Sequence, residues 1–351
     1  MPQKRQTSFL PPLQSNWQLV LLLIWLLLSG SALAQPMPRC VYVASYTPGY
    51  VWQDGIEHGL RHNLVGQCEL HTFYMDTKNL KEESYRQARG EAARDFIERL
   101  DPDVVIVSDD NAVRYVLQPH YRNHERPFVF CGVNDTALSY GLPYRNTTGM
   151  IERKEISDLL YLIHRAAPGI KRMAFLGTPT VTAQKNAQAF AKSPDLPEPL
   201  QVHWVSNLTQ WQAQFLALQQ DDSVDAVILG NMIPLIQKDS ERQDSELQDS
   251  KSLQTNALPK WVAEHTRKLS VTVYEWMMPY AALGVVNSAE EQGEWAALSA
   301  LAILEGLPPN RIPVVANQRF QFALNPLIWD KLHLNLPISL QSNIATSGWS
   351  Q

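Results

Sequence analysis

Cysteine is scarce in this 351-residue chain, and its scarcity excludes two kinds of small scaffold. Three cysteines are too few for a disulfide-dense fold, and no C-x-x-C pair is present to hold structural zinc. Positive charge is also limited, because 30 Lys and Arg face 35 Asp and Glu, for a net charge of -5. Without a basic excess the chain lacks the electrostatic footprint of nucleic-acid-binding proteins, so we expect no nucleic-acid partner.

Several common enzyme motifs are missing as well. The chain contains no G-x-S-x-G, no P-loop, no H-E-x-x-H and no G-x-G-x-x-G, and its nine histidines are scattered. We therefore expect no enzymatic activity, no catalytic residues, no cofactor and no metal. An enzyme that uses carboxylates in a cleft is kept as the weaker alternative.

The longest apolar run is short for a membrane-spanning helix. It covers about ten residues, 19–28, whereas a helix needs roughly 20 to cross the hydrocarbon core. Lys4 and Arg5 precede the run, and small residues ending at Ala34 follow it. This order is typical of a secretory signal peptide. We predict a signal peptide over 1–34, cleaved near Ala34, and a periplasmic protein; a retained membrane anchor is the alternative.

The rest of the chain alternates short apolar runs with amphipathic stretches, and 45% of all residues are hydrophobic, enough for a sizeable core. The pattern predicts strands at 40–45, 68–74, 103–107, 127–131, 172–176, 201–205, 226–229, 271–275, 312–315 and 320–324. Helices are expected at 51–64, 82–100, 112–117, 154–167, 183–192, 210–219, 258–269, 290–304 and 326–332. Such alternation is typical of parallel sheets with crossover helices, so the predicted class is α/β, with two Rossmann-like lobes.

One stretch interrupts this alternation. Residues 237–254 read QKDSERQDSELQDSKSLQ and offer almost no apolar side chain to bury. Burial therefore cannot offset the entropy lost on ordering. We interpret the stretch as a mobile polar insertion, with a solvated helix as the alternative.

Ligands of open parallel sheets bind beyond the carboxyl ends of the strands, and polar and aromatic residues follow several predicted strands here. The predicted ligand-binding residues are Ser45, Tyr46, Tyr50, Trp52, Ser108, Asp109, Asp110, Asn111, Gly132, Asn134, Thr178, Asn231, Glu275 and Trp276. Helix N-termini suit a carboxylate, acidic side chains suit an ammonium group, and aromatic rings provide flat walls. A small zwitterion or a flat polar molecule would fit such a site.

Each of these residues also has a structural explanation. Ser108, Asp109 and Asp110 are residue types that cap the N-terminus of a following helix. Trp52 recurs with Ile56 and Leu60 at helical spacing, which is typical of a core residue. Trp276 lies at a break before Pro279 and fits a cleft or a hinge.

The cysteines have different expected roles. Cys40 and Cys68 begin two predicted strands that are separated by one helix, so both lie at the same edge of neighbouring parallel strands. In an oxidising compartment this position favours a disulfide over two free thiols. Cys131 ends a predicted strand and is expected to be a small buried hydrophobe.

Four segments carry a resemblance to a known family. They read VYVASYTPGYVWQDGIEHGL, DPDVVIVSDDNAVRYV, PFVFCGVND and LGVVNSAEEQGEWAALSALAILEGLPPNRIPVV. Together they resemble the ABC-transporter substrate-binding proteins that include tryptophan- and tyrosine-binding members. Asp109, Asp110 and Trp276 stand where many relatives carry small hydroxyl residues, so the ligand of those members is not carried over.

The resemblance implies the type 1 periplasmic-binding-protein fold, in which two lobes joined by a hinge close on a ligand. It places the N-terminal lobe at 39–149 plus 281–308 and the C-terminal lobe at 150–279 plus 312–337. It further implies a monomer that binds a small molecule and delivers it to an ABC permease in the membrane. A ligand-sensing subunit for a separate membrane signalling protein is the main alternative.

Overall fold

A computed structural model describes residues 36–78, 82–232, 235, 250–334 and 344–345. The predicted signal peptide over 1–34 lies outside the described residues, and so does most of the predicted insertion. In the described part of the chain, no helix combines the length and the apolar character needed to cross a membrane.

The described end of the predicted insertion is helical. Residues 250–254 form the beginning of α10 (Ser250–His265), which corrects the prediction of a mobile loop at this point. No glycine or proline separates these residues from the predicted helix at 258–269, so the helical backbone continues upstream.

The first of two sheets has the strand order β11-β5-β4-β3-β1-β2, and every neighbouring pair is parallel. Its strands are β1 (Arg39–Ala44), β2 (Glu69–Tyr74), β3 (Val104–Ser108), β4 (Phe128–Asn134), β5 (Thr147–Glu152) and β11 (Val315–Ala316). The helical segments between them are α2 (Val51–Leu64), α3 (Glu83–Leu100), α4 (Asp109–Ala112), η1 (Val113–Leu117), α5 (Gln118–His120) and η2 (Ala137–Tyr140).

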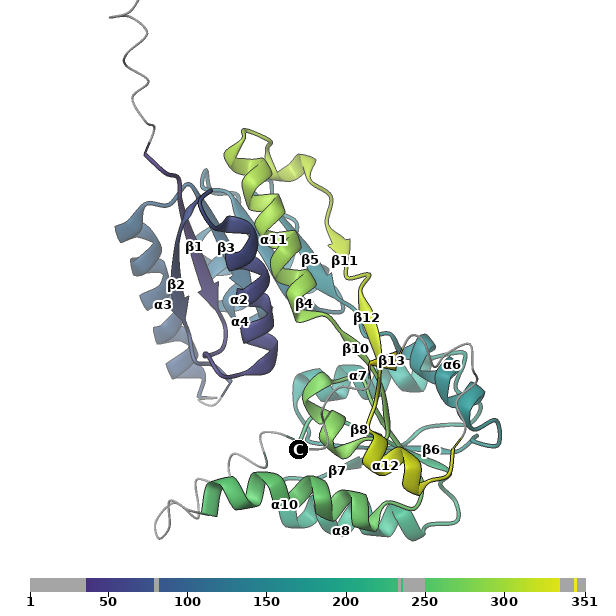
Figure 1. Ribbon diagram of the computed structural model, residues 1–351. Coiled ribbons are helices and arrows are strands. Elements are labelled where there is room, and N and C mark those ends of the chain that lie inside the picture. Colours follow the sequence, from purple (N-terminus) through teal and green to yellow (C-terminus); the bar gives the residue numbers. More distant parts are fainter. Residues whose placement is uncertain (1–35, 79–81, 233–234, 236–249, 335–343, 346–351) are drawn as a thin grey trace, which may run out of the picture. The chain divides into compact units, whose positions relative to one another are not determined.

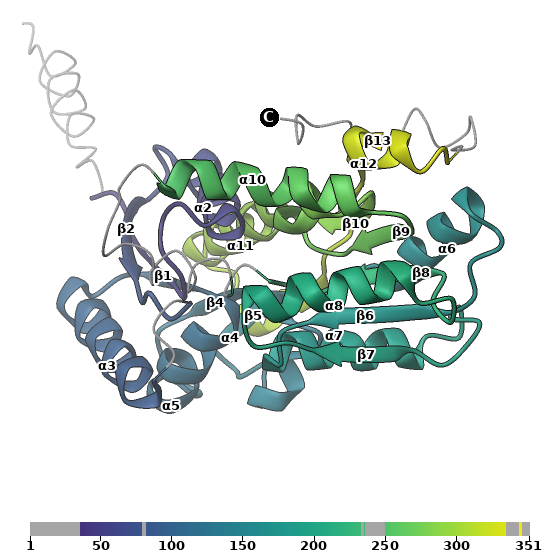
Figure 2. The same cartoon turned by 90° about the horizontal axis from the view of Figure 1, so that it is seen from below.

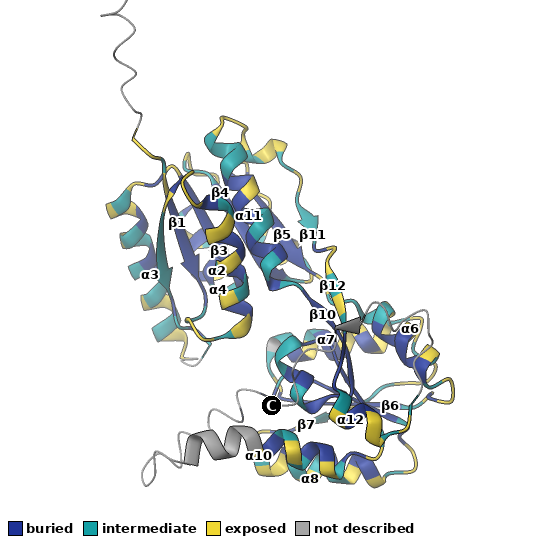
Figure 3. Cartoon of the chain, in the orientation of Figure 1, coloured by how far each residue is buried: buried dark blue, intermediate teal, exposed yellow. Residues whose placement is uncertain are grey.

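Both faces of this sheet are covered, which explains why β1, β3 and β4 read as continuous apolar runs. Along β1, Tyr42 faces a cluster with α2 and α11 (Ala289–Leu304), whereas Val41 and Val43 face a cluster with α3 and η1. Figure 3 shows β1, β3, β4 and β5 as mostly buried, whereas the edge strands β2 and β11 are only partly buried.

Helices α2 and α11 lie side by side on the first face (Figure 1) and approach each other through glycines. A Cβ atom at Gly59 would lie 2.4 Å from the carbonyl oxygen of Glu290, and one at Gly293 would lie 2.0 Å from that of Ile56. Both positions therefore require a residue without a side chain.

The second sheet has the order β13-β12-β10-β9-β8-β6-β7 and is parallel except for the antiparallel pair β10 and β12. Its strands are β6 (Met173–Gly177), β7 (Gln201–Trp204), β8 (Ala226–Leu229), β9 (Leu269–Thr272), β10 (Leu283–Asn287), β12 (Phe320–Leu324) and β13 (Ile344–Ala345). The helical segments of this half, drawn with the sheet in Figure 2, are α6 (Ile156–Ala166), α7 (Val181–Lys192), α8 (Leu208–Gln220), α10, η3 (Glu275–Tyr280) and α12 (Pro326–Lys331). Two parallel-dominated sheets with flanking helices confirm the predicted α/β class.

Strand pairing differs from the predicted lobe boundaries at three points. The boundary between 149 and 150 falls inside β5, which belongs to the first sheet throughout. Strand β10 was assigned with 281–308 to the N-terminal lobe, but it pairs with β9 and β12 in the second sheet. Strand β11 was assigned with 312–337 to the C-terminal lobe, but it pairs with β5 in the first sheet. The chain passes between the sheets after β5, after β10 and between β11 and β12, and η4 (Pro309–Arg311) precedes β11.

These three connections are linked to one another by hydrogen bonds. The side chain of Asn287 donates to the carbonyl oxygen of Arg153 at 2.7 Å, and the amide of Arg153 donates to Asn317 Oδ1 at 2.7 Å. Glu291 accepts from the amides of Gln318 and Arg319 at 2.9 and 2.8 Å. The predicted hinge motion would therefore involve the three connections together.

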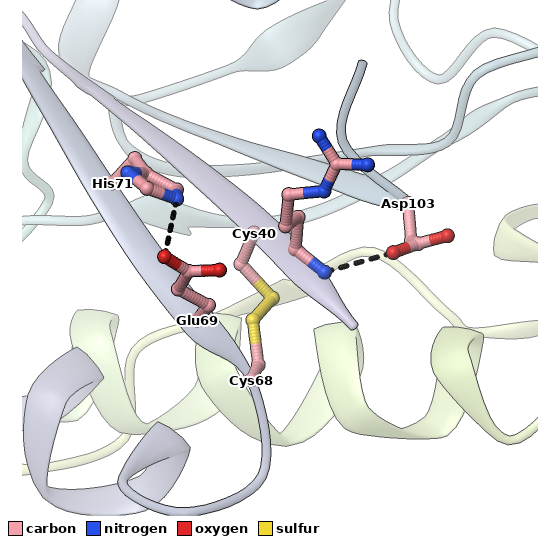
Figure 4. The surroundings of a disulfide bond; sticks show 6 residues. Cys40, Cys68, Glu69, His71 and Asp103 are labelled. Carbon is pink, nitrogen blue, oxygen red and sulfur yellow. Dashed lines mark hydrogen bonds and ion pairs between the residues drawn. A yellow bond between two sulfur atoms is a disulfide. The ribbon is translucent and has the colours of Figure 1, made fainter. Parts of the chain in front are cut away.

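Cys40 and Cys68 form a disulfide at the beginning of β1 and just before β2 (Figure 4). Their Cα atoms are 6.0 Å apart, and 28 positions separate them in the sequence. Cys131 is a buried free cysteine. The structure thus joins the two cysteines that the sequence analysis paired.

Candidate functional site

The register of the first sheet brings several strand ends to one edge. Ala44 pairs with Ser108, and Ser108 pairs with Cys131, so the carboxyl ends of β1 and β3 are aligned with each other and lie beside the second half of β4. A shift in register then pairs Asn134 of β4 with Glu152, the last residue of β5. The residues after these strands consequently meet at a common edge, as expected for an open parallel sheet.

A cavity of about 250 Å³ collects residues from the loops of both sheets. Its lining residues are Tyr46, Tyr50, Trp52, Thr77, Lys78, Arg86, Asp109, Asp110, Asn111, Arg114, Asn134, Tyr140, Glu152, Lys154, Thr180, Thr182, Lys185, Asn231, Tyr274 and Trp276. Its volume suits a small molecule rather than a polymer.

The structure brings most of the predicted site residues together around this cavity. Those that line it are Tyr46, Tyr50, Trp52, Asp109, Asp110, Asn111, Asn134, Asn231 and Trp276. The other predicted residues, Ser45, Ser108, Gly132, Thr178 and Glu275, are absent from the lining. Contact of any of these side chains with a ligand stays a prediction.

Four of the residues outside the lining support the loops. Ser45 Oγ donates to the carbonyl oxygen of Ser108 at 2.6 Å and accepts from the amide of Ala112 at 2.8 Å. Ser108 Oγ is 2.9 Å from the hydroxyl of Tyr42. Thr178 donates to the carbonyl oxygen of Asn231 at 3.1 Å, and the amide of Gly132 donates to a buried glutamine. Glu275, half-buried in η3, has a pKa raised by burial.

The three residues proposed as helix caps do not cap. Neither Ser108 nor the side chains of Asp109 and Asp110 bond to the amides of α4, because Ser45 takes the amide of Ala112 instead. Asp110 accepts from the hydroxyl of Tyr140 at 2.7 Å and from the amide nitrogen Nδ2 of Asn134 at 2.5 Å. The side chains of Asp109 and Asp110 thus bond to other residues that line the cavity rather than to the helix.

Asp109 is the buried acid of the cavity, with a relative exposure of 2%. Its Oδ1 accepts a 2.9 Å hydrogen bond from Trp52 Nε1, and its Oδ2 has no hydrogen-bond partner among the described residues. Burial raises the pKa of Asp109 to about 8, the bond from Trp52 opposes this rise, and the charges of Glu152 and Asp110 add to it. A carboxyl group with such a pKa is mostly protonated at neutral pH.

Gly132 explains how the backbone leaves room for this carboxyl group. Its φ of +66° lies in the left-handed region, and a Cβ atom there would lie 3.1 Å from Asp109 Oδ1. A side chain at position 132 would therefore crowd the acid as well as strain the backbone.

Aromatic rings form the walls. Trp276 lies 5.4 Å from Tyr50, 6.5 Å from Trp52 and 5.0 Å from Tyr274, measured between ring centroids, and Tyr46 lies 5.3 Å from Tyr50. Trp52 is 4% exposed and packs in the core of the first sheet, so it is both a core residue and a wall. Trp276 Nε1 donates to Asn231 Oδ1 at 3.1 Å, which fixes the ring at the edge of the second sheet.

Two lysines that lie among these aromatic rings were not predicted as site residues. Lys78 donates to the hydroxyl of Tyr50 at 3.0 Å, and its Nζ lies 4.7 Å from the ring centre of Tyr46. Lys154 pairs with Glu152, and its Nζ lies 4.9 Å from the ring centre of Tyr274. Both lysines follow strands, β2 and β5, whose ends were left out of the predicted site.

The remaining unpredicted lining residues are Thr77, Arg86, Arg114, Tyr140, Thr180, Thr182, Lys185 and Tyr274. Thr180 caps α7 by accepting from the amide of Ala183 at 3.2 Å. Within the described residues, no group of three or more His, Cys, Asp or Glu side chains is placed to hold a metal ion.

Comparison with known proteins identifies the fold. No model of a protein family matches the chain, and no curated protein sequence is similar to it. Among solved structures, the ABC domain in complex with L-Trp from Streptococcus pneumonia has a TM-score of 0.63 at 14% identity, covering 88% of this chain and 99% of that one. A ligand-free, open substrate-binding protein with adhesive properties from Clostridium difficile has a TM-score of 0.64 at 12% identity, covering 88% and 98%.

A third similar structure is a conserved domain protein from Vibrio cholerae, with a TM-score of 0.63, 15% identity, and 88% and 99% of the two chains covered. Similarity over nearly the whole length of these structures confirms the predicted type 1 periplasmic-binding-protein fold. At such low identity the similarity concerns the fold, and the ligand has to be argued from this chain's own cavity.

Proposed function

We propose that this protein is an exported solute-binding protein that captures one small polar molecule with a flat or aromatic part between its two lobes. The single observation that carries the proposal is the cavity to which the loops of both sheets contribute. It combines aromatic walls with a buried acid and several cations, which is the composition of a site for a small polar ligand. The proposal involves no chemical turnover.

The neighbours with the same fold support this role. One holds L-Trp, and another is described as a substrate-binding protein. We propose that this chain likewise delivers its ligand to an ABC permease and that it acts as a monomer. In such a cycle the ligand favours a closed arrangement of the lobes, and the permease would distinguish that arrangement from the empty one.

Export is part of the proposal. Disulfides such as Cys40–Cys68 form and persist in oxidising compartments, and the periplasm is one of them. The N-terminal sequence, with its charged, apolar and small-residue parts, supports the same location.

A thermal-shift screen against amino acids, aromatic acids, purines and sugars tests the proposal. A ligand at 100 times its Kd stabilises the native state by roughly 2.7 kcal/mol, which is a clear rise in Tm. We expect a compound with a flat ring to raise the Tm of the folded protein that has been stripped of ligand. No shift with any class would contradict a solute-binding role.

The variant Trp276→Ala tests whether the ligand that raises the Tm binds in the cavity. It removes one wall of the cavity and should reduce the thermal shift of any bound compound. Trp204→Ala is the matched control, because Trp204 is 39% exposed on the edge strand β7 and is not among the lining residues. An equal loss of shift in both variants would contradict the cavity as the binding site.

A further inference from the structure

The charges of the cavity have the opposite sign to those of the whole chain. The sequence carries a net charge of -5, yet five Lys and Arg side chains line the cavity against three carboxyl groups. The positive ones are Lys78, Arg86, Arg114, Lys154 and Lys185, and the acidic ones are Asp109, Asp110 and Glu152. A cleft with an excess of one sign concentrates small molecules of the other sign.

Ion pairs among the lining residues do not remove the excess of positive charge in the cavity. Glu152 and Lys154 pair with each other, and their side chains are only 6% and 8% exposed. Asp110 is occupied by neutral donors, the hydroxyl of Tyr140 and the side chain of Asn134. It therefore cancels no particular cation by direct contact.

Three of the cations form no ion pair with any residue that the structure describes. These are Arg86, Arg114 and Lys185. Arg86 also has a buried Nε atom for which the described residues supply no acceptor. A buried donor without an acceptor is costly, and the described residues leave the Arg86 guanidinium neither paired with a carboxylate nor fully hydrogen-bonded.

Asp109 adds to the positive balance. Its carboxyl group is buried, forms no ion pair with a described cation, and has no hydrogen-bond partner at Oδ2 among the described residues. In its protonated form it carries no charge and can donate a hydrogen bond from Oδ2 to an oxygen of a ligand. An acid of this kind accommodates an anion instead of repelling it.

We propose that the cavity selects a small aromatic molecule with net negative charge, such as an aromatic carboxylate without an ammonium group. This inference rests on the proposed solute-binding function and narrows its ligand class. The aromatic walls accommodate the ring, while Arg86, Arg114 and Lys185 supply the field that favours the anion, and Asp109 donates to an oxygen of the ligand.

Three indoles that share a ring and differ in charge test this selection by isothermal titration calorimetry at pH 7. They are indole-3-propionate (an anion), L-tryptophan (a zwitterion) and tryptamine (a cation). We expect indole-3-propionate to bind tightest and tryptamine weakest, with about tenfold or more between them. Added salt should weaken the binding of the anion and not that of the cation.

The outcomes separate the two claims. Tryptamine binding as tightly as indole-3-propionate, or tighter, would overturn the charge selection while leaving the solute-binding function intact. Failure of all three indoles to bind would count against the aromatic solute proposed above, and the charge selection would fall with it.

Variants that remove one positive charge test whether the cations of the cavity cause the preference for the anion. Arg114→Gln and Lys185→Gln should each weaken indole-3-propionate severalfold and leave tryptamine unchanged or slightly tighter. Lys171→Gln is the control, because Lys171 is exposed and is not among the lining residues. An equal effect of Lys171→Gln would show that the net charge of the chain, and not the cavity, determines the preference.

Discussion

At the first residue after β3 the backbone adopts a left-handed conformation, with φ of 67° at Asp109. Such a conformation is uncommon outside glycine, although aspartate tolerates it better than most residues. The turn holds the carboxyl group against Gly132 and beneath the indole N–H of Trp52. An unusual backbone conformation, burial and an oxygen atom without a hydrogen-bond partner among the described residues thus coincide at Asp109, which is typical of a functional position.

The raised pKa of Asp109 predicts how stability depends on pH. A carboxyl group whose pKa rises from 3.8 in the unfolded chain to about 8 in the folded protein favours folding at low pH. That contribution is complete below about pH 4 and disappears as the pH rises through about 8. Asp109→Asn keeps an acceptor for Trp52 and does not titrate, so the wild type should lose stability relative to this variant between these limits.

The loss is up to roughly 6 kcal/mol, because the shift is about four pKa units and each unit corresponds to about 1.4 kcal/mol. Urea unfolding of both proteins at pH 4, 6, 8 and 9 measures it. The difference should grow between pH 4 and 8 and level off above. Parallel curves over this range would show that Asp109 is ionised in the folded protein.

Binding should depend on the same proton. Above about pH 8 the ionised Asp109 would repel an anionic ligand, so indole-3-propionate should bind more weakly, and Asp109→Asn should remove this dependence. The ionisable groups that interact with Asp109 are Tyr42, Tyr46, Tyr50, Lys78, Asp110, Cys131 and Glu152. The pKa values of the three tyrosines lie well above their usual range, so they stay neutral in this window. An affinity that is constant from pH 7 to 9 would contradict the role of the proton.

The residues that the sequence predicted and those it missed differ in one respect. Asp109 follows a strand that is recognisable as an apolar run, whereas Glu152 ends β5 and Lys154 follows it, and β5 begins Thr147-Thr148-Gly149. The residues Thr147, Thr148 and Gly149 are buried, and the ring of Phe130 lies against Gly149, where a Cβ atom would be 2.2 Å from that ring. Only the packing of β5 against β4 identifies it as a strand, and no local pattern contains that information.

At the scale of elements, the contact between α2 and α11 should be the least tolerant of added volume. Gly293→Ala places a methyl group against the backbone of α2, where no side-chain rotation can relieve it. We expect a loss of about 2 to 4 kcal/mol in the free energy of unfolding, measured by urea denaturation. Gly169→Ala is the control, since nothing lies within 4 Å of a Cβ atom there. Equal stability of the two variants would contradict this packing.

The disulfide joins the beginnings of β1 and β2 and should stabilise the first sheet. For a loop of 28 residues, replacing Cys40 and Cys68 with serine should cost roughly 3 to 4 kcal/mol. Alkylation of the denatured, unreduced wild type should modify one thiol, that of Cys131. Three modified thiols, measured by intact mass, would show that the exported protein lacks the bridge.

Helices and strands themselves were largely predictable, and their sheet membership was less so. The apolar runs at 40–45, 103–107 and 127–131 coincide closely with β1, β3 and β4, because parallel strands covered on both faces leave a continuous apolar signature. Strands β10 and β11 were assigned to the wrong sheets, since a run of five apolar residues or fewer indicates a strand but does not identify its neighbour.

At the scale of the whole molecule, both sheets contribute residues to one cavity. The first sheet supplies Tyr46 and Asp109 from loops after β1 and β3, and the second supplies Asn231 and Trp276 from segments after β8 and β9. A ligand held by both halves would favour their closure through the three connections, which are already linked by Asn287 and Glu291.

Calorimetric titration of the protein with indole-3-propionate tests this claim most directly. We predict one molecule bound per chain, with the affinity lowered about tenfold or more by Tyr46→Ala in one lobe and equally by Trp276→Ala in the other. Leu298→Ala on α11 and Tyr161→Ala on α6 are the controls in the two lobes, because both side chains are more than half exposed (56% and 53%). Binding that is lost in only one of the two cavity variants, or in neither, would contradict a site shared by the two lobes.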